Sequence, residues 1–153
     1  MAKEIERKFL VNPSTIPFEG TGDELMQGYL SITESGLTRI RVTGKEGFLT
    51  IKSNTIGISR DEYEYAIPFD DAKRLIKLSQ GEIIHKTRTK VNYDGKIWEI
   101  DEFHGKNEGL WLAEIELATS NEPFSKPGWV LEEVSEDERY FNSNLSMNPF
   151  CEW

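Results

Sequence analysis

Residues 4–11 read Glu-Ile-Glu-Arg-Lys-Phe-Leu-Val. In an extended strand the side chains alternate between two faces, so Glu4, Glu6 and Lys8 share one face. The two carboxylates lie roughly 6.6 Å apart along the strand, a gap that flexible glutamate side chains can close onto one divalent cation. Lys8 can contact an anion that the cation also holds. This pattern indicates either a site for a metal and a phosphate or a solvated strand face with alternating charges.

The composition limits the class of protein. The chain has 153 residues and a formal net charge of −9, so we expect a single domain over residues 1–153 with a sizeable core. The acidity argues against a nucleic-acid or membrane-surface partner. Neither a membrane-length apolar run nor a signal peptide is present, and the single cysteine, Cys151, excludes an internal disulfide. We therefore expect a cytoplasmic protein.

Short alternating segments separated by turn residues predict hairpins in an antiparallel sheet. A loop is expected over residues 12–22, which contain two prolines and two glycines. The predicted strands cover residues 4–11, 25–32, 37–42, 48–52, 60–67, 84–93, 96–103 and 110–118, with a further short strand over 129–134.

Two helices are expected between and after these strands. In the first, Asp70 is the predicted N-cap and Gly81 the predicted stop. Its apolar stripe is expected to consist of Leu75, Ile76 and Leu78. The second is predicted over residues 135–145, with a serine as its N-cap. It would either cap one end of the sheet structure or pack in a homodimer.

Most strands carry two charged residues of the same sign on one face, two positions apart. These pairs are Glu4/Glu6, Arg39/Arg41, Glu62/Glu64, Lys86/Arg88, Glu99/Asp101 and Glu114/Glu116. Like charges side by side destabilise a sheet, whereas blocks of opposite sign attract when strands face each other. Two arrangements are open: the charges face water around an apolar core, or the sheet closes into a barrel with the charges inside. A barrel of about eight strands can hold one small ligand.

The charges of such a lumen nearly cancel. Its basic members would be Lys8, Arg39, Arg41, Lys52, Lys86, Arg88 and Lys90. Its acidic members would be Glu4, Glu6, Glu62, Glu64, Glu99, Asp101, Glu114 and Glu116. The lumen would carry −1 and the rest of the chain the other −8 of the net charge of −9. A divalent cation would make the lumen positive, which suits a metal-chelated polyanion.

The segment at residues 4–8 matches the Glu-x-Glu-x-Lys signature of the CYTH group, also called triphosphate tunnel metalloenzymes. The resemblance continues in order through residues 27–30, 39–41, 49–52, 62–64, 86–88, 98–101, 112–117 and 139–142. It implies an α+β, mainly β fold: a closed eight-stranded antiparallel β-barrel, or tunnel, with a charged lumen and a few flanking helices.

The resemblance also implies roles for individual residues. The phosphate-binding cations would be Lys8, Arg39, Arg41, Lys52, Lys86 and Arg88. The ligands of Mg²⁺ or Mn²⁺ would be Glu4, Glu6 and Glu116, helped by Glu114. A second metal, or the attacking water, would be held by Glu62 and Glu64. Assistance to catalysis would come from a Lys–Tyr pair that Lys8 and Tyr29 match. Glu99 and Asp101 are expected to neutralise and orient the basic side chains.

The function implied is metal-dependent hydrolysis of inorganic triphosphate to pyrophosphate and phosphate, because the chain resembles short members without an accessory domain. The alternatives are hydrolysis of an organic triphosphate (thiamine triphosphate or a nucleotide), an adenylate cyclase, or a non-catalytic module that binds polyphosphate or nucleotide. A plain β-barrel with a wet outer face would bind no triphosphate. The expected partner is therefore a small-molecule triphosphate, with no nucleic acid and no membrane.

Overall fold

The computed structural model describes residues 3–16 and 22–153, so the predicted loop over 12–22 lies partly outside the described residues. Its strands are β1 (Lys3–Val11), β2 (Asp23–Thr33), β3 (Gly36–Val42), β4 (Gly47–Ser53), β5 (Ser59–Ile67), β6 (Gln80–Tyr93), β7 (Lys96–Phe103), β8 (Trp111–Glu116) and β9 (Val130–Glu133). All the predicted strands are present, with ends that differ by a few residues.

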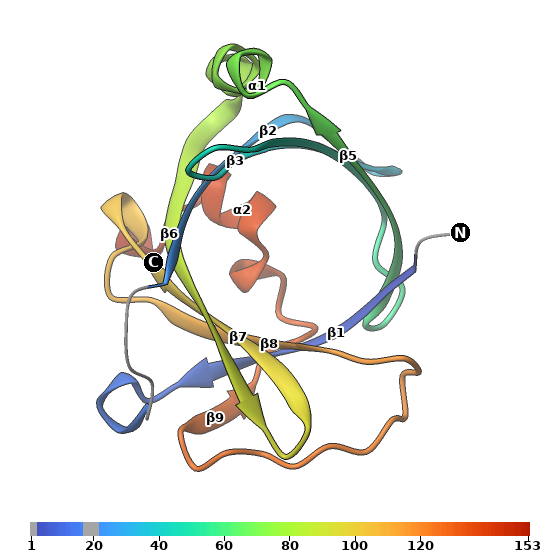
Figure 1. Ribbon diagram of the computed structural model, residues 1–153, viewed down its shortest axis with the longest axis vertical. Helices are drawn as coiled ribbons and strands as arrows, with labels where there is room; N and C mark the ends of the chain where they lie inside the picture. Colours follow the sequence, from blue (N-terminus) through green and yellow to red (C-terminus); the bar gives the residue numbers. More distant parts are fainter. Residues whose placement is uncertain (1–2, 17–21) are drawn as a thin grey trace.

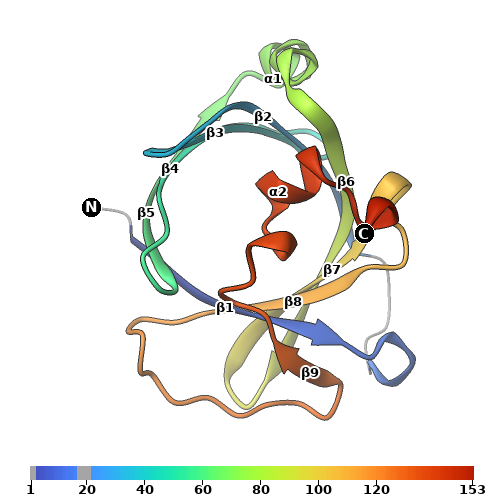
Figure 2. The same ribbon diagram turned by 180° about the vertical axis from the view of Figure 1, so that it is seen from behind.

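The strands form one antiparallel sheet in the order β5-β4-β3-β2-β6-β7-β8-β1-β9, and an additional pairing of β5 with β1 closes it. Strands β1 to β8 make the ring seen in Figures 1 and 2, and β9 lies outside it against β1. The predicted closed eight-stranded antiparallel barrel is therefore confirmed.

Strand β1 closes the barrel because its partners change along its length. On one edge, residues 6–10 pair with β8. On the other edge, residues 3–5 pair with β5, and β9 takes the place of β5 from Phe9 onward. The segment that carries the Glu-x-Glu-x-Lys signature thus joins the two ends of the sheet.

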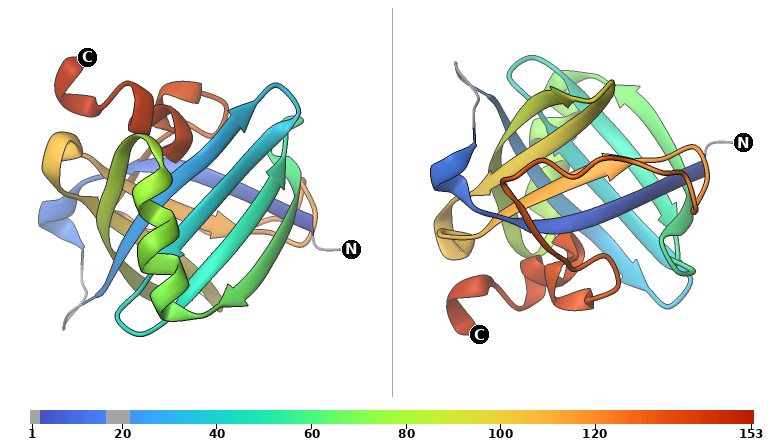
Figure 3. Two further views of the ribbon diagram at one scale, coloured as in Figure 1. Left: turned by 90° about the horizontal axis from the view of Figure 1, so that it is seen from above. Right: turned by 90° about the horizontal axis from the view of Figure 1, so that it is seen from below.

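The outer face of the barrel over β1, β7 and β8 is covered by apolar packing. Phe9, Trp98 and Ile115 are buried with Trp129 beneath the connection that follows β8, which crosses this face (Figure 3). The rings of Phe9 and Trp98 lie 5.5 Å apart. Alternation along β1 and β7 therefore sends Phe9 and Trp98 outward, whereas Glu4, Glu6, Lys8 and Glu99 face the interior of the barrel.

Helix α1 (Phe69–Leu75) lies across the outer face of the barrel and continues as a 3-10 turn over Ile76–Leu78. Asp70 is not its N-cap, which is Pro68; Asp70 lies in the first turn, where a carboxylate favours the helix dipole. Leu78 is 68% exposed because the tighter 3-10 turn moves it off the buried face. Gly81 is not the stop, since it lies inside β6.

The predicted helix over 135–145 is divided into two pieces. A 3-10 turn spans Glu138–Tyr140 with Asp137 as its cap, and α2 spans Asn142–Met147 after extended backbone at Phe141. Ser135 is not a cap, because its hydroxyl accepts the backbone N–H of Lys8 at 2.9 Å. Viewed along the barrel, α2 lies within the ring of strands (Figure 2). Three-residue 3-10 turns complete the described chain at Pro13–Thr15, Gly105–Asn107 and Phe150–Glu152.

None of the described helices has the length and apolar character that are needed to cross a membrane.

Candidate active site

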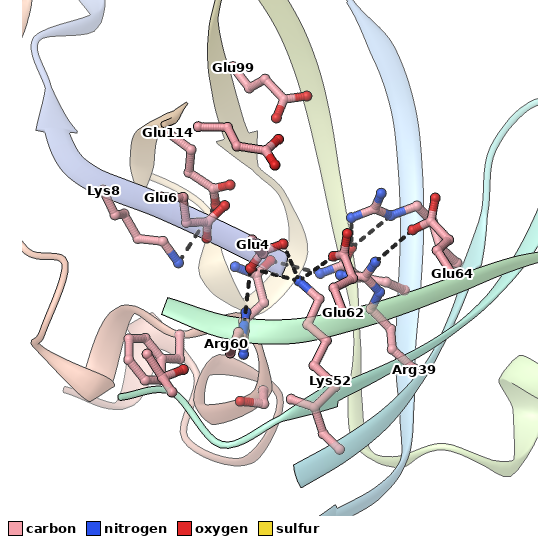
Figure 4. A pocket seen from close by; sticks show the side chains of 18 of the residues that line it. Glu4, Glu6, Lys8, Arg39, Lys52, Arg60, Glu62, Glu64, Glu99 and Glu114 are labelled. Carbon is pink, nitrogen blue, oxygen red and sulfur yellow. Dashed lines mark hydrogen bonds and ion pairs between the residues drawn. The ribbon is translucent and has the colours of Figure 1, made fainter. Parts of the chain in front are cut away.

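The charged faces of the strands point into the barrel and line a cavity of about 210 Å³ (Figure 4). The lining contains every candidate site residue: Glu4, Glu6, Lys8, Tyr29, Arg39, Arg41, Lys52, Glu62, Glu64, Lys86, Arg88, Glu114 and Glu116. Over the whole lining, seven cationic and seven acidic side chains occur, so their formal charges cancel. Of the two arrangements left open by the sequence, the one with the charges inside is observed.

Glu4 on β1 is held by two cations. Its carboxylate oxygens lie 3.1 Å from Lys52 Nζ and 3.1 Å from Arg60 Nε (Figure 4). Lys52 Nζ also lies 3.1 Å from Glu62. Burial raises the pKa of Glu4, but Lys52, a hydrogen bond with Glu62, and Arg60 together outweigh burial, and the pKa lies well below its usual range. Glu4 is therefore ionised at neutral pH.

Glu6 has different surroundings from Glu4, two residues away on the same face. Among the described residues, no cationic nitrogen lies within 4.0 Å of its carboxylate. Burial, followed by the carboxylates of Glu114 and Glu4, raises the pKa of Glu6 to about 8. Glu6 also lies directly opposite Glu116 in the register of β1 and β8, and opposed like charges destabilise a sheet. A divalent cation placed here would relieve this repulsion.

Asp101 on β7 lies beneath the lining of the cavity and contacts two of its cations, Lys86 and Arg88. It is fully buried, accepts hydrogen bonds from Arg88 at 2.8 and 2.9 Å, and lies 2.9 Å from Lys86 Nζ. Arg88 also lies 3.3 Å from Glu99 and 3.6 Å from Glu114. Burial lowers the pKa of Lys86 to about 7, although Asp101 opposes the shift. The contacts of Asp101 with Lys86 and Arg88 are those expected if Asp101 neutralises and orients basic side chains.

Lys8 and Tyr29 both face the cavity but interact with different groups. Lys8 Nζ donates a hydrogen bond to the carbonyl of Tyr140 at 3.2 Å and lies 3.7 Å from Glu114. The hydroxyl of Tyr29 accepts a hydrogen bond from Gln27 at 3.3 Å. In residues 3–16 and 22–153, no hydrogen bond joins Lys8 to Tyr29. Their predicted partnership therefore requires a ligand between them or a shift of one side chain.

Comparison with known proteins identifies the family to which the sequence is similar. The model of the CYTH domain matches residues 2–146 of the chain.

The chain belongs to the CYTH domain family.

Relatives of this CYTH domain match along almost its whole length. An inorganic triphosphatase of Acetivibrio thermocellus is 44% identical over 151 residues, covering 98% of this chain and 97% of the relative. An inorganic triphosphatase of Nitrosomonas europaea is 40% identical over 150 residues, covering 95% and 97%. A crystal structure of an inorganic triphosphatase superposes with a TM-score of 0.69 at 38% identity, covering 96% of each chain.

The lining of this CYTH domain also contains residues that were not predicted. Arg60 lies in the wall, whereas the prediction that Lys90 belongs to the lumen is wrong, because Lys90 is exposed and is not in the lining. Arg60 shares its strand face with Glu62 and Glu64, so alternation alone could have identified it. Asn142 comes from the C-terminal segment, and strand alternation carries no signal for it.

The acidic side chains of the CYTH domain fit a hard divalent cation by their chemistry. Carboxylate oxygens are the ligands that Mg²⁺ and Mn²⁺ prefer. Glu6 and Glu116 lie directly opposite each other on the paired strands β1 and β8. In the part of the chain that the structure describes, no group of three His, Cys, Asp or Glu side chains is arranged as a metal site. Glu4 and Glu114 are instead bound to cations, so metal binding would require them to exchange partners.

Proposed function

We propose that this chain is a metal-dependent triphosphatase that hydrolyses inorganic triphosphate to pyrophosphate and phosphate inside the tunnel. The observation that carries this proposal is the cavity itself, in which cationic side chains from five strands line the same space as carboxylates on β1 and β8. The names of the two relatives support the same substrate.

The cationic side chains would bind the phosphate chain. Arginine suits this role because its planar guanidinium meets two phosphoryl oxygens at once. The phosphate-binding residues would be Lys8, Arg39, Arg41, Lys52, Lys86 and Arg88. At the cations that are paired with carboxylates, a phosphoryl oxygen would take the place of the carboxylate, so these cations would keep their charge compensation when the substrate binds.

The carboxylates would hold the metal. Glu4, Glu6 and Glu116 are the proposed ligands of Mg²⁺ or Mn²⁺, helped by Glu114. The bound cation would neutralise charge on the phosphoryl oxygens. Hydrolysis also needs a water in line with the bond that breaks, and Glu62 and Glu64 would orient that water or hold a second metal.

Lys8 and Tyr29 are proposed to assist the proton transfer that accompanies bond cleavage. Both side chains line the cavity. The Tyr29 hydroxyl is fixed by Gln27, and the cationic Lys8 would favour loss of its proton when both groups contact one phosphoryl group.

The size and polarity of the cavity favour the inorganic substrate. Sites for drug-sized organic ligands usually enclose roughly 300–1,000 Å³ and are mostly apolar, whereas this cavity has about 210 Å³. Its apolar lining residues are only Leu37, Ile58 and Phe141 in the described chain. A nucleotide or thiamine triphosphate would therefore have to leave its organic part outside, and an adenylate cyclase would lack a wall for its base.

Phosphate release from inorganic triphosphate, ATP and thiamine triphosphate, with Mg²⁺ or Mn²⁺, tests the proposal. We expect triphosphate to be the fastest substrate and Arg41→Ala to lower kcat/KM by about 10²–10³-fold, the usual effect of removing one group that stabilises developing charge. Arg74→Ala, on the exposed side of α1, is the matched control. Thermal stabilisation by triphosphate without turnover would instead indicate a binding module.

A further inference from the structure

Arg41 is the exception among the cations that line the tunnel. The other six each have a carboxylate oxygen within 4.0 Å: Lys8, Arg39, Lys52, Arg60, Lys86 and Arg88. Among the described residues, no carboxylate comes that close to Arg41. Arg41 is half-buried, and a cation that is withdrawn from water without a compensating anion is costly.

The group that holds Arg41 is the neutral amide of Gln27. Its Oε1 accepts hydrogen bonds from Arg41 Nε at 3.3 Å and from Nη2 at 3.2 Å. Gln27 lies directly opposite Arg41 in the register of β2 and β3 and is 1% exposed. Burial, followed by the charges of Arg39 and Arg88, lowers the pKa of Arg41 to about 10. Gln27 therefore orients the guanidinium without neutralising it.

A second amide extends this arrangement to β6, which pairs with β2 on the edge away from β3. Gln27 Nε2 donates to Asn142 Oδ1 at 2.9 Å, and the same oxygen accepts a hydrogen bond from Lys86 Nζ at 2.9 Å. Two cations on β3 and β6 are thus connected through two neutral side chains. Each amide uses its oxygen for a cation, as a carboxylate would, but adds no negative charge.

We propose that Gln27 and Asn142 are positioning residues for the substrate: they fix Arg41 and Lys86 as a pair and leave Arg41 without a carboxylate partner, so that a phosphoryl group becomes its counter-ion. This inference rests on the proposed function, because it presumes a triphosphate in the tunnel. Arg41 then anchors the phosphate chain. The absence of charge on the Gln27 and Asn142 amides contributes to substrate affinity, in addition to their hydrogen bonds.

Asn142 reaches this position because the C-terminal segment docks on the barrel. Val134 N–H donates to the carbonyl of Lys8 at 2.8 Å, and Leu145 of α2 is fully buried beside Ile84 and Phe103. The amide pair is therefore complete only when residues 134–147 are in place. Docking of this segment and preparation of the phosphate site are one event.

Substitutions that add charge with little change of shape test the proposal. Asn142→Asp keeps an oxygen that accepts from Lys86 and Gln27, and Gln27→Glu keeps the acceptor for Arg41. We expect each to raise the Kd of inorganic triphosphate at least tenfold, measured by isothermal titration in metal-free buffer at pH 6.5, where Lys86 is mostly charged. In the metal-loaded enzyme, KM should rise by more than kcat falls. Gln80→Glu and Asn148→Asp, both exposed, are the matched controls.

Gln27→Met separates charge from hydrogen bonding, because it is neutral and of similar size. We expect it to weaken triphosphate binding by less than Gln27→Glu does, with unfolding temperatures of the variants compared to exclude misfolding. Affinities within threefold of the wild type for both charged variants would overturn the proposal, as would an equal loss in Gln27→Met and Gln27→Glu. Triphosphate binding without turnover in the wild type would overturn the proposed function alone, and no binding would overturn both.

Discussion

At the scale of single residues, Glu4 and Glu6 differ although they share one strand face. Glu4 is compensated by Lys52 and Arg60, whereas Glu6 faces Glu114 and Glu116. The pKa of Glu4 is accordingly lowered and that of Glu6 raised to about 8. In the metal-free protein, Glu6 is therefore mostly protonated at neutral pH, and a cation that binds there must displace its proton.

This difference predicts how stability depends on pH. Because the folded pKa of Glu6 lies above its ordinary value of 4.5, its stabilising effect is complete below pH 4.5 and is lost as the pH rises through 8. Glu6→Gln mimics the protonated carboxyl. The free energy of unfolding of the metal-free wild type should therefore fall relative to Glu6→Gln by up to about 1.4 kcal/mol per pH unit in this window.

Urea denaturation in a chelator at pH 5, 6, 7 and 8 measures this difference. Parallel curves for wild type and Glu6→Gln would contradict the raised pKa of Glu6. Added Mg²⁺ supplies a second readout: its stabilisation of the wild type should increase with pH, because fewer protons then compete for the carboxylate.

Asp101 gives a second prediction at this scale. It is the buried anion between Lys86 and Arg88, so Asp101→Asn would leave two buried cations with less compensation. We expect the free energy of unfolding to fall by about 3–5 kcal/mol, as when one partner of a buried ion pair is removed. The control Glu82→Gln breaks the exposed pair with Lys106 and should cost less than about 1 kcal/mol.

Equilibrium denaturation of Asp101→Asn and Glu82→Gln distinguishes these two cases. Equal, small losses would show that Arg88 is adequately compensated by Glu99 and Glu114 alone.

At the scale of elements, the turn after α1 is packed tightly against β2. A Cβ at Gly28 would lie 1.8 Å from Ser79 Oγ and 3.1 Å from Ile76 Cγ1. Gly28→Ala should therefore destabilise the protein by about 1–3 kcal/mol, the usual cost of overpacking. Gly128→Ala is the control, because nothing lies within 4 Å of the Cβ it would add. Thermal unfolding of both variants checks this; equal unfolding temperatures would mean that the turn moves without cost.

The helices were harder to predict than the strands. Pro68 follows β5 and is the N-cap of α1, with its carbonyl accepting a hydrogen bond from Ala72 N–H and no side chain capping the helix. The prediction of Asp70 as the N-cap was wrong because it relied on a capping side chain. The C-terminal helix is interrupted at Phe141 by extended backbone. Short helices whose ends are fixed by tertiary contacts, such as the bond from Lys8 N–H to Ser135, leave little periodic signal in the sequence.

At the scale of the whole molecule, alternation on each strand predicted which side chains share a face, and the same-sign blocks indicated that those faces oppose each other. Glu4, Arg41 and Arg88 lie in one cavity for that reason. The sequence could not predict the contacts of Asn142, because they depend on how a distant segment docks. Nor could it predict that Asp101 lies behind the wall, since its burial depends on packing between strands.

The most direct test of the central claim is ³¹P NMR of inorganic triphosphate incubated with the protein and Mg²⁺. The triphosphate tunnel predicts that one pyrophosphate and one phosphate appear for each triphosphate lost, that a chelator stops the reaction, and that Arg41→Ala slows it while Arg74→Ala does not. Unchanged triphosphate, or equal rates in Arg41→Ala and the wild type, would contradict the claim that the charged tunnel is the site of hydrolysis.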